Sequence, residues 1–310
     1  MTRKVVTVTL NPALDLTGSL ENITLGKVSL VNQGHLHAAG KGVNVAKVLS
    51  DLGADVTVTG FLGADNQAAF VETFAAMRAH DQFVRVPGST RINVKLVETH
   101  GRVSDINFPG IEIDSSAIKA LTSKLTALCP DHDYFIFSGS LPPGVAPKQL
   151  ADWISYLTDQ GKKVALDSSH AALEHGIKAK PWMIKPNQDE LAELMQRPLT
   201  SRNELQSAAQ QLASYGIKHV VVSMGATGAM WLSHGQWRIA SPPSMELVST
   251  VGAGDSFVAG FCWAAMQSFE ARKQLGFATA ISALAVNQIG VGVSDINQVI
   301  GLKKQVIMQG

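Results

Sequence analysis

"VNVAKVLSDLGADVTVTGF", residues 43–61, changes from one structural pattern to another at Gly53. Residues 43–53 follow a helical pattern that Gly53 ends, whereas residues 55–61 form a short apolar, β-branched run typical of a strand. Similar strand runs occupy residues 4–10, 133–139, 163–167, 182–185 and 219–225, with helical patterns between them, such as 204–216. This alternation predicts an α/β fold with a mostly parallel central sheet and helices on both faces.

Two stretches interrupt the alternation. Residues 14–32 and 82–108 alternate apolar and polar side chains and contain Gly-rich turns, which predicts antiparallel hairpins. We expect the two stretches to pair into one small sheet that forms a lid over the active edge of the core. Residues 257–266 are apolar on every side, so they predict a buried helix. The absence of linkers and repeats predicts a single domain over residues 1–310.

The composition limits the class of protein. Of the 310 residues, 45% are hydrophobic and 16% are charged, and the formal net charge is +1, which argues against a nucleic-acid-binding protein. The two cysteines, Cys129 and Cys262, lie far apart in apolar surroundings, as expected of a reduced cytoplasmic protein. The N-terminal residues read as a first strand and not as a signal peptide, and no apolar run is long enough to span a bilayer.

A glycine-rich stretch, "STVGAGDSFVAG" (249–260), stands at the start of the predicted buried helix. A helix N-terminus carries partial positive charge and unpaired N–H groups, so it attracts anions. Two interpretations follow. Either Asp255 stabilises the helix end, or the amides of Gly252, Ala253 and Gly254 bind a substrate anion while Asp255 takes part in the chemistry.

A second motif, "KPNQDE" (185–190), also has two interpretations. Asn187 and Glu190 have the spacing of a capping box, and Pro186 stops any helix upstream. The same pair would suit a water-mediated Mg²⁺ ion, with Lys185 reaching a nucleotide phosphate. "SMGATG" (223–228) is either a β-turn or a stretch of backbone that contacts a nucleotide.

Further candidates follow strands or begin helices. "AAGKGVNVA" (38–46) lacks the spacing of a nucleotide P-loop, but Gly40 and Asn44 suit either a tight turn or the hydroxyls of a sugar. Arg91 and Lys95 point the same way from the predicted lid, either as phosphate ligands or as solvated surface cations. His35 and His37 have no third partner at metal-ligand spacing, so we expect neither to bind a metal.

In their order along the chain, "AGKGVNVAKVLSDLG", "KPNQDE", "SMGATG" and "STVGAGDSFVAGF" resemble the motifs of the ribokinase-like carbohydrate kinases, also called the phosphofructokinase B family. The resemblance covers nearly the whole chain. It implies a ribokinase-like three-layer sandwich and an ATP- and Mg²⁺-dependent sugar kinase. Asp255 then matches the catalytic base, and the amides of residues 252–255 match the anion hole.

The resemblance also implies roles for the other candidates. The sugar hydroxyls would be bound by Asp15, Gly40, Lys41 and Asn44, and the phosphate already on the sugar by Arg91, with Lys27 and Ser140 as further candidates. ATP and Mg²⁺ would be bound by Lys185, Asn187, Glu190, Ser223, Met224, Gly225, Ala226, Thr227, Gly228 and Gly254, with Asn287 beside the adenine.

The stretches "VTLNPALD", "RINVKL" and "SGSLPPGV" are most similar to family members that phosphorylate fructose 1-phosphate at the 6-hydroxyl. Tagatose 6-phosphate and fructose 6-phosphate are the alternative substrates, because a fructofuranose ring is nearly symmetric when its ends are exchanged. A non-catalytic sugar-phosphate sensor is a further alternative. A Rossmann dehydrogenase is excluded, because neither glycine cluster has the required spacing. The open edges of the lid predict a lid-to-lid homodimer.

Overall fold

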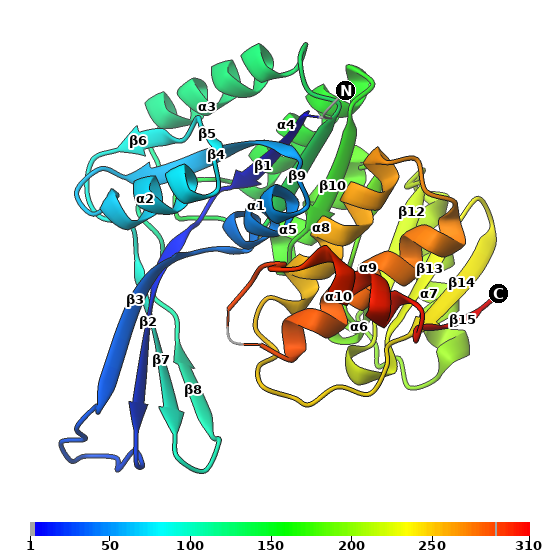
Figure 1. The fold of residues 1–310 in the computed structure, drawn as a ribbon. Helices are drawn as coiled ribbons and strands as arrows, with labels where there is room; N and C mark the ends of the chain where they lie inside the picture. The colour runs from blue at the N-terminus through cyan, green and yellow to red at the C-terminus, as the bar shows by residue number, and fades with distance from the viewer. Residues whose placement is uncertain (1–3, 289) are drawn as a thin grey trace.

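The computed structural model describes residues 4–288 and 290–310, and its centre is one long twisted sheet (Figure 1). The parallel strands are β1 (Lys4–Thr9), β4 (Asp55–Gly63), β9 (Tyr134–Ser138), β10 (Lys163–Asp167), β11 (Met183–Ile184) and β12 (His219–Ser223), with β5 (His80–Asp81) and β6 (Val84–Val86) beside β4. An antiparallel end is formed by β13 (Ala229–Ser233), β14 (Gln236–Ser241) and β15 (Ile307–Gln309). The predicted mostly parallel sheet is confirmed.

Helices cover both faces of this sheet and bury a separate apolar core on each. One core contains side chains from α1 (Lys41–Asp51), α2 (Ala68–Ala76), α8 (Ala253–Met266), α9 (Ala271–Val286) and α10 (Ile296–Lys303). The other contains side chains from α3 (Ser115–Leu128), α4 (Pro147–Asp159), α5 (His170–Gly176), α6 (Gln188–Leu194) and α7 (Arg202–Ser214). The chain is therefore the predicted three-layer sandwich, and α8 is the predicted buried helix.

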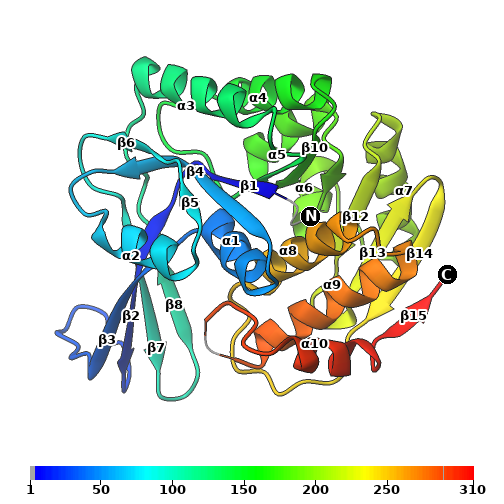
Figure 2. The same ribbon diagram turned by 45° about the horizontal axis from the view of Figure 1, so that its top comes forward.

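Two helices of one face, α1 and α8, lie side by side in both views (Figures 1 and 2). The backbone of α1 lies very close to β1. A Cβ atom added to Gly42 would be only 2.2 Å from the hydroxyl oxygen of Thr9. Glycine is the residue type that permits this approach. The close packing places the first turn of α1 at the carboxyl ends of the strands.

The lid is a second, smaller sheet that projects from the β1–β4 side of the sandwich (Figure 2). It consists of β2 (Ala13–Leu20), β3 (Gln33–Ala39), β7 (Ile92–Glu98) and β8 (Val103–Ile106). The hairpins β2–β3 and β7–β8 are antiparallel, as predicted, and a parallel β2–β7 pair joins them.

The lid boundaries differ from those expected from the sequence. The return strand β3 lies beyond the predicted segment 14–32, and most of residues 21–32 form an exposed loop whose apolar and polar residues alternate as they do in a strand. Residues 84–86 form β6, which pairs with β4 in the central sheet because Val84 and Val86 are buried in the core.

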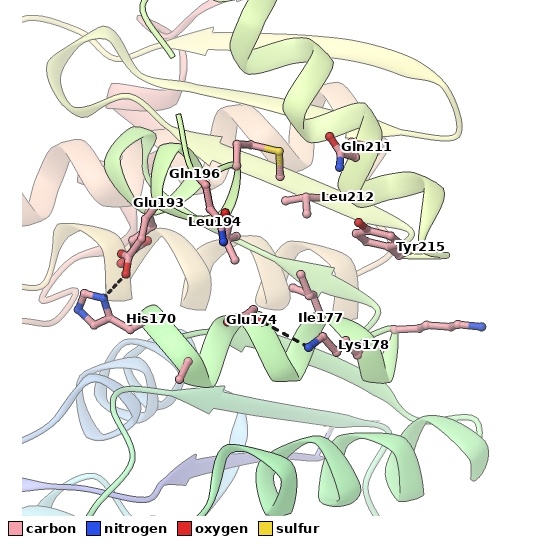
Figure 3. Close-up of a pocket in the computed structure, with 14 residues that line it drawn as sticks. His170, Glu174, Ile177, Lys178, Glu193, Leu194, Gln196, Gln211, Leu212 and Tyr215 are labelled. Carbon is pink, nitrogen blue, oxygen red and sulfur yellow. Dashed lines mark hydrogen bonds and ion pairs between the residues drawn. The ribbon is translucent and has the colours of Figure 1, made fainter. Parts of the chain in front are cut away.

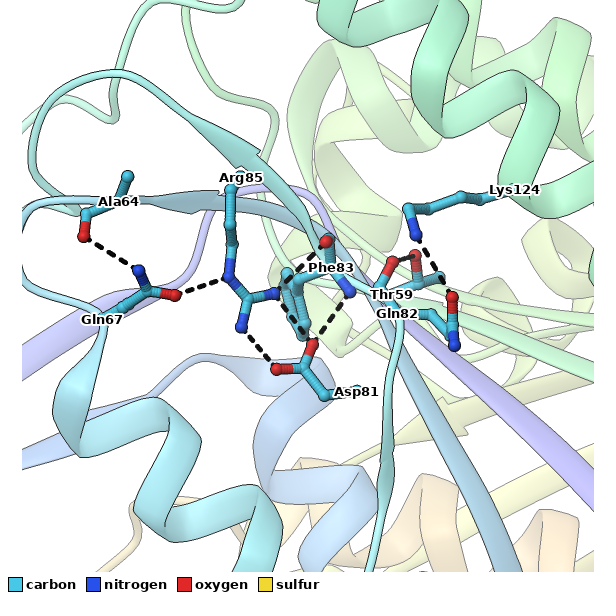
Figure 4. A network of polar contacts seen from close by, with 8 residues as sticks. All are labelled: Thr59, Ala64, Gln67, Asp81, Gln82, Phe83, Arg85 and Lys124. Atoms are coloured by element: carbon cyan, nitrogen blue, oxygen red, sulfur yellow. Dashed lines mark hydrogen bonds and ion pairs between the residues drawn. The ribbon is translucent and has the colours of Figure 1, made fainter.

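A polar network holds β5 and β6 against the start of α2, close to where the chain enters the lid (Figure 4). The guanidinium of Arg85 donates to Asp81 at 2.9 Å and to the side chain of Gln67 at 2.7 Å. The side-chain amide of Gln67 donates in turn to the carbonyl of Ala64 at 3.1 Å. These contacts fix the base from which β7 extends.

Candidate active site

The first turn of α8 leaves the backbone N–H groups of Gly254 and Asp255 without a helical partner, whereas the Ala253 N–H, also predicted to bind the anion, donates to the Thr250 carbonyl at 3.4 Å. Gly252 precedes the helix in the left-handed region, with φ of 77°, and a Cβ atom there would be 2.3 Å from the side chain of Val291. The first bond of the helix runs from the Ser256 N–H to the Gly252 carbonyl, at 2.8 Å. The N–H groups of Gly254 and Asp255 lie in the first turn, where a helix supplies no carbonyl partner. This turn is suited to bind an anion.

Asp255 occupies the third position of α8, from which an acidic side chain can cap the start of a helix. Its carboxylate instead accepts a hydrogen bond of 2.7 Å from the side-chain amide of Asn44 on α1. Because Asp255 is only 6% exposed, burial raises its pKa, and the nearby Asp167 carboxylate raises it further, to about 6. A carboxyl group with this pKa is a better proton acceptor than an ordinary aspartate.

A buried carboxylate and two lysines lie beside Asp255. Asp167, the last residue of β10, contacts Lys185 Nζ at 3.1 Å and Lys41 Nζ at 3.7 Å. Burial would raise the pKa of Asp167, but the two ammonium groups outweigh burial and lower it. The same contact with Asp167 raises the pKa of Lys41. Lys185 Nζ also lies 3.5 Å from the place that a Cβ atom on Gly254 would occupy, so it borders the amide turn.

The capping box predicted from "KPNQDE" is confirmed. The side chain of Asn187 accepts a bond of 2.8 Å from the Glu190 amide, and Glu190 Oε2 accepts one of 2.9 Å from the Asn187 amide. Asn187 is exposed and Glu190 is half-buried, and the charge of Glu190 acts on Lys41. The pair therefore begins α6 and borders the site at the same time.

A cavity of about 730 Å³ is lined in part by Ala253 and Gly254 of the amide turn. Its lining includes predicted residues, most of which offer only backbone groups: Asn187, Ser223, Gly225, Ala226, Gly228, Ala253 and Gly254. Its apolar part comes from residues that sequence reasoning missed, among them Pro242, Met245, Leu247, Phe257 and Ala283. A pocket lined by backbone groups and apolar side chains together suits the phosphates and the base of a nucleotide.

Three other predicted nucleotide residues lie around this cavity without lining it. Met224 and Thr227 belong to the same turn, in which the Thr227 hydroxyl donates to the Met224 carbonyl at 2.7 Å. Asn287 ends α9, next to the lining residue Val286, and its side-chain amide donates to the Glu246 carbonyl at 3.1 Å.

Several predicted sugar-binding residues lie at the junction of the lid and the core. Gly40 precedes α1, and Asp15 on β2 accepts a bond of 3.2 Å from the side-chain amide of Asn93 on β7. The hydroxyl of Ser140 accepts a bond of 3.1 Å from the side chain of Asn11, which follows β1. The first bond joins two lid strands, and the second joins the loop after β9 to the segment that follows β1.

The lid cations differ in their surroundings. The guanidinium of Arg91 donates to the carbonyls of Asn11, Phe108 and Pro12 at 3.0, 3.0 and 3.3 Å, and burial lowers its pKa. Lys95 pairs with Asp105 at 3.5 Å, and the exposed Lys27 lies in the loop between β2 and β3. Figure 1 shows that this loop is at the far end of the lid, so the single chain does not bring Lys27 to Asp255.

A second cavity, of about 740 Å³, lies between α5, α6 and α7 (Figure 3). At its rim His170 contacts Glu193 at 2.7 Å and Lys178 contacts Glu174 at 3.4 Å. Of the predicted site residues it contains Glu190 alone, so the cavity beside α8 is the candidate for substrate binding. His35 and His37 are exposed on β3, and within residues 4–288 and 290–310 no three His, Cys, Asp or Glu side chains form a metal-binding group.

A proton acceptor at a helix N-terminus, lysines beside it and a nucleotide-sized cavity define an enzyme class that transfers a phosphoryl group to a hydroxyl. The chain belongs to the pfkB family of carbohydrate kinases, whose family model matches residues 4–298. It is an ATP-dependent sugar-phosphate kinase. The family and the fold predicted from the sequence are thus confirmed.

Known relatives match over their full length. The chain is 56% identical to the 1-phosphofructokinase of Vibrio cholerae, over 99% of this chain and 96% of the relative. It is 46% identical to the 1-phosphofructokinase of Escherichia coli K12, over 100% and 99%.

Solved structures show the same fold. The phosphofructokinase-2 of E. coli in complex with substrates and products is 26% identical, with a TM-score of 0.91 over 97% of this chain and 99% of that one. A tetrameric inhibited form of the same enzyme has a TM-score of 0.89 at 27% identity, over 98% and 99%.

Proposed function

We propose that the protein transfers the γ-phosphoryl group of ATP to the 6-hydroxyl of fructose 1-phosphate and releases fructose 1,6-bisphosphate and ADP. The observation that carries this proposal is the buried Asp255 carboxylate beside the unpaired amides of α8, with a nucleotide-sized cavity next to them. The full-length similarity to proteins named 1-phosphofructokinase supports the choice of sugar.

In this reaction Asp255 accepts the proton of the 6-hydroxyl while that oxygen forms a bond to the γ-phosphorus. The bond from the γ-phosphorus to the bridging oxygen of ADP breaks, and ADP leaves with its electron pair. The N–H groups of Gly254 and Asp255 and the ammonium of Lys185 would stabilise the negative charge on the transferred group. Asn44 orients the carboxylate of Asp255 through their 2.7 Å bond.

The sugar would lie between the lid and α1, where Asp15, Gly40, Lys41 and Asn44 would bind its hydroxyls. Its phosphate would be bound by Arg91 and Ser140. Arg91 has five N–H donors, and the three carbonyls it contacts leave two of them for a phosphate oxygen. Arg91 would therefore bind the substrate and, at the same time, hold the lid to the turn at Asn11 and Pro12 that follows β1.

ATP would place its phosphates against Lys185, Asn187 and residues 223–228, with Asn287 near the adenine. The side chains of Asn187 and Glu190 suit an Mg²⁺ ion bound through water. In the capping box Glu190 accepts through Oε2, so its Oε1 can face a hydrated ion. Mg²⁺ held by Asn187 and Glu190 would neutralise part of the charge on the phosphates of ATP.

We also propose that two copies associate through their lids. The lid exposes large apolar side chains: Leu16, Leu36, Ile92, Val103 and Ile106 on its strands and Leu25, Val28 and Leu30 in the loop between β2 and β3. Leu25 is 93% exposed and Val28 90%, and β3 and β8 leave open strand edges. A second lid would cover these groups. The tetrameric form of the E. coli phosphofructokinase-2 supports association within the family.

We place the enzyme in the cytoplasm, where ATP is available and where Cys129 and Cys262, which are both free and buried, stay reduced. Within residues 4–288 and 290–310, no helix is long and apolar enough to cross a membrane.

The test is a coupled ADP-release assay with fructose 1-phosphate, fructose 6-phosphate and tagatose 6-phosphate as acceptors. We expect kcat/KM for fructose 1-phosphate to exceed the other two by tenfold or more, about 1.4 kcal/mol of discrimination. A higher value for either 6-phosphate would replace the proposed substrate, and no ADP release with any of them would overturn the kinase assignment.

A further inference from the structure

Asp167 is a buried charged residue of the site with no role in binding substrate in the proposed function. Only 2% of its surface is exposed, and its carboxylate contacts Lys185 Nζ at 3.1 Å and Lys41 Nζ at 3.7 Å and accepts a bond of 3.4 Å from the Ser138 hydroxyl. Removing a carboxylate from water costs free energy unless cations and donors replace the water. The two ammonium groups and the Ser138 hydroxyl therefore stabilise Asp167 in this position.

The two lysines come from different parts of the chain and meet at Asp167. Lys41 is the first residue of α1, three residues before Asn44, and Lys185 follows β11. Lys185 Nζ borders the amide turn at Gly254, and both ammonium groups act electrostatically on Asp255. A lysine side chain has about 2 kcal/mol of rotamer entropy to lose when it is held in one place. A buried counter-ion removes that freedom before the substrates bind.

We propose that Asp167 is a positioning residue for phosphoryl transfer: it holds the ammonium groups of Lys41 and Lys185 beside the anion-binding turn of α8 and the base Asp255. It does not touch the reacting atoms and acts through the two lysines. This inference rests on the proposed kinase function, because it assigns Lys185 to the charge that develops on the transferred group and Lys41 to the sugar. Preorganised charge of this kind lowers the barrier because it does not have to reorient during the reaction.

Asp167 also affects the base directly. The charged groups that face Asp255 are Asp167 from β10, Lys41 from α1 and Lys185 after β11, and Asn44 donates to it. Asp167 contributes to the raised pKa of Asp255, whereas the lysines and Asn44 lower it. Removal of the charge on Asp167 should therefore lower the pKa of Asp255 and extend activity to lower pH.

The test is Asp167→Asn, which keeps the size of the side chain and removes its charge. We expect kcat with fructose 1-phosphate and MgATP to fall about 10- to 100-fold, with a much smaller change in KM for the sugar. The acid midpoint of the pH–kcat/KM profile should move below that of wild type. Ser168→Ala is the matched control, because it removes a neighbouring buried bond of 2.7 Å to the Gly139 carbonyl without changing charge. The control should lower Tm and leave the pH midpoint in place.

The inference would be overturned if Asp167→Asn kept the kcat and the pH midpoint of wild type. It would also be overturned if Ser168→Ala showed the lower kcat and the lower pH midpoint that we expect of Asp167→Asn. If Asp167→Asn does not fold, the double variant Asp167→Asn/Lys185→Met removes the buried ion pair together and is compared with Lys185→Met alone. The pH midpoint of the double variant should be the lower of the two, and equal midpoints would contradict the inference. Failure of the proposed function is recognised separately, because wild type would then release no ADP with fructose 1-phosphate.

Discussion

Asp255→Asn should make the protein both much less active and more stable. The pKa of Asp255 is raised from an ordinary value of 3.8 to about 6. The folded protein therefore keeps this proton in a pH range where the unfolded chain has already released it. Across that range, from about pH 4 to about pH 6, the free energy of unfolding of wild type falls as the pH rises.

The size of the stability effect follows from the same shift. A rise of about two pH units in the pKa corresponds to a loss on the order of 3 kcal/mol above pH 6, at about 1.4 kcal/mol per unit. An asparagine at this position carries no charge, so the variant avoids that loss and can still accept the hydrogen bond of Asn44. We expect Tm of the variant to exceed that of wild type by several degrees at pH 8, and the two values to converge near pH 4.

The catalytic effect has the opposite sign. Removal of a positioned proton acceptor should lower kcat by about 10²- to 10⁴-fold. Thermal unfolding at pH 4 and pH 8, together with ADP release at pH 8, measures both effects on the same samples. Asp152→Asn, which breaks an exposed ion pair with Lys148 on α4, is the control for charge removal and should change neither quantity. A variant less stable than wild type at pH 8, with normal turnover, would show that Asp255 supports the fold and not the reaction.

Further predictions concern the pH profile, the metal, the lid and the assembly. The acid limb of the wild-type pH–kcat/KM profile should have its midpoint near the Asp255 pKa of about 6, and a midpoint near 4 would argue against a buried base. Glu190→Gln keeps the capping box and should shift the activity curve to higher Mg²⁺ with little change in Tm; an unchanged curve would leave only the structural role. Arg91→Ala should raise KM for fructose 1-phosphate about tenfold to a hundredfold with partial recovery in Arg91→Lys, and an equal fall in kcat/KM for free fructose would assign Arg91 to the lid alone. Leu25→Asp with Val28→Asp should reduce the sedimentation coefficient to that of a monomer, whereas Ile300→Asp on α10 should not; an unchanged value in the lid variant would contradict the lid dimer.

The sequence predicts those parts of the site that lie within one continuous motif. Asp255 and the amides of α8 belong to one such stretch, and the capping box of Asn187 and Glu190 follows from a spacing of three residues. The alternation of strands and helices predicts the layers, because each element has to bury one face in a shared core.

Other parts depend on contacts between distant segments. Asp167 is the last residue of a predicted strand, but its importance arises where α1 and the end of β11 bring two lysines to it. The carbonyl contacts of Arg91 depend on the turn at Asn11 and Pro12, about eighty residues away along the chain. The loop between β2 and β3 carries a strand-like pattern, and only the register of β3 against β2 shows that residues 33–39 form the return strand.

The most direct measurement follows the phosphoryl group itself. Wild type and Asp255→Asn are incubated with γ-³²P-labelled ATP, Mg²⁺ and fructose 1-phosphate, and the label is counted in fructose 1,6-bisphosphate and in inorganic phosphate. We expect one labelled bisphosphate for each ADP formed by wild type and a rate about 10²- to 10⁴-fold lower in the variant. Label in inorganic phosphate alone, or equal rates for the two proteins, would contradict the assignment of Asp255 as the base of a sugar-phosphate kinase.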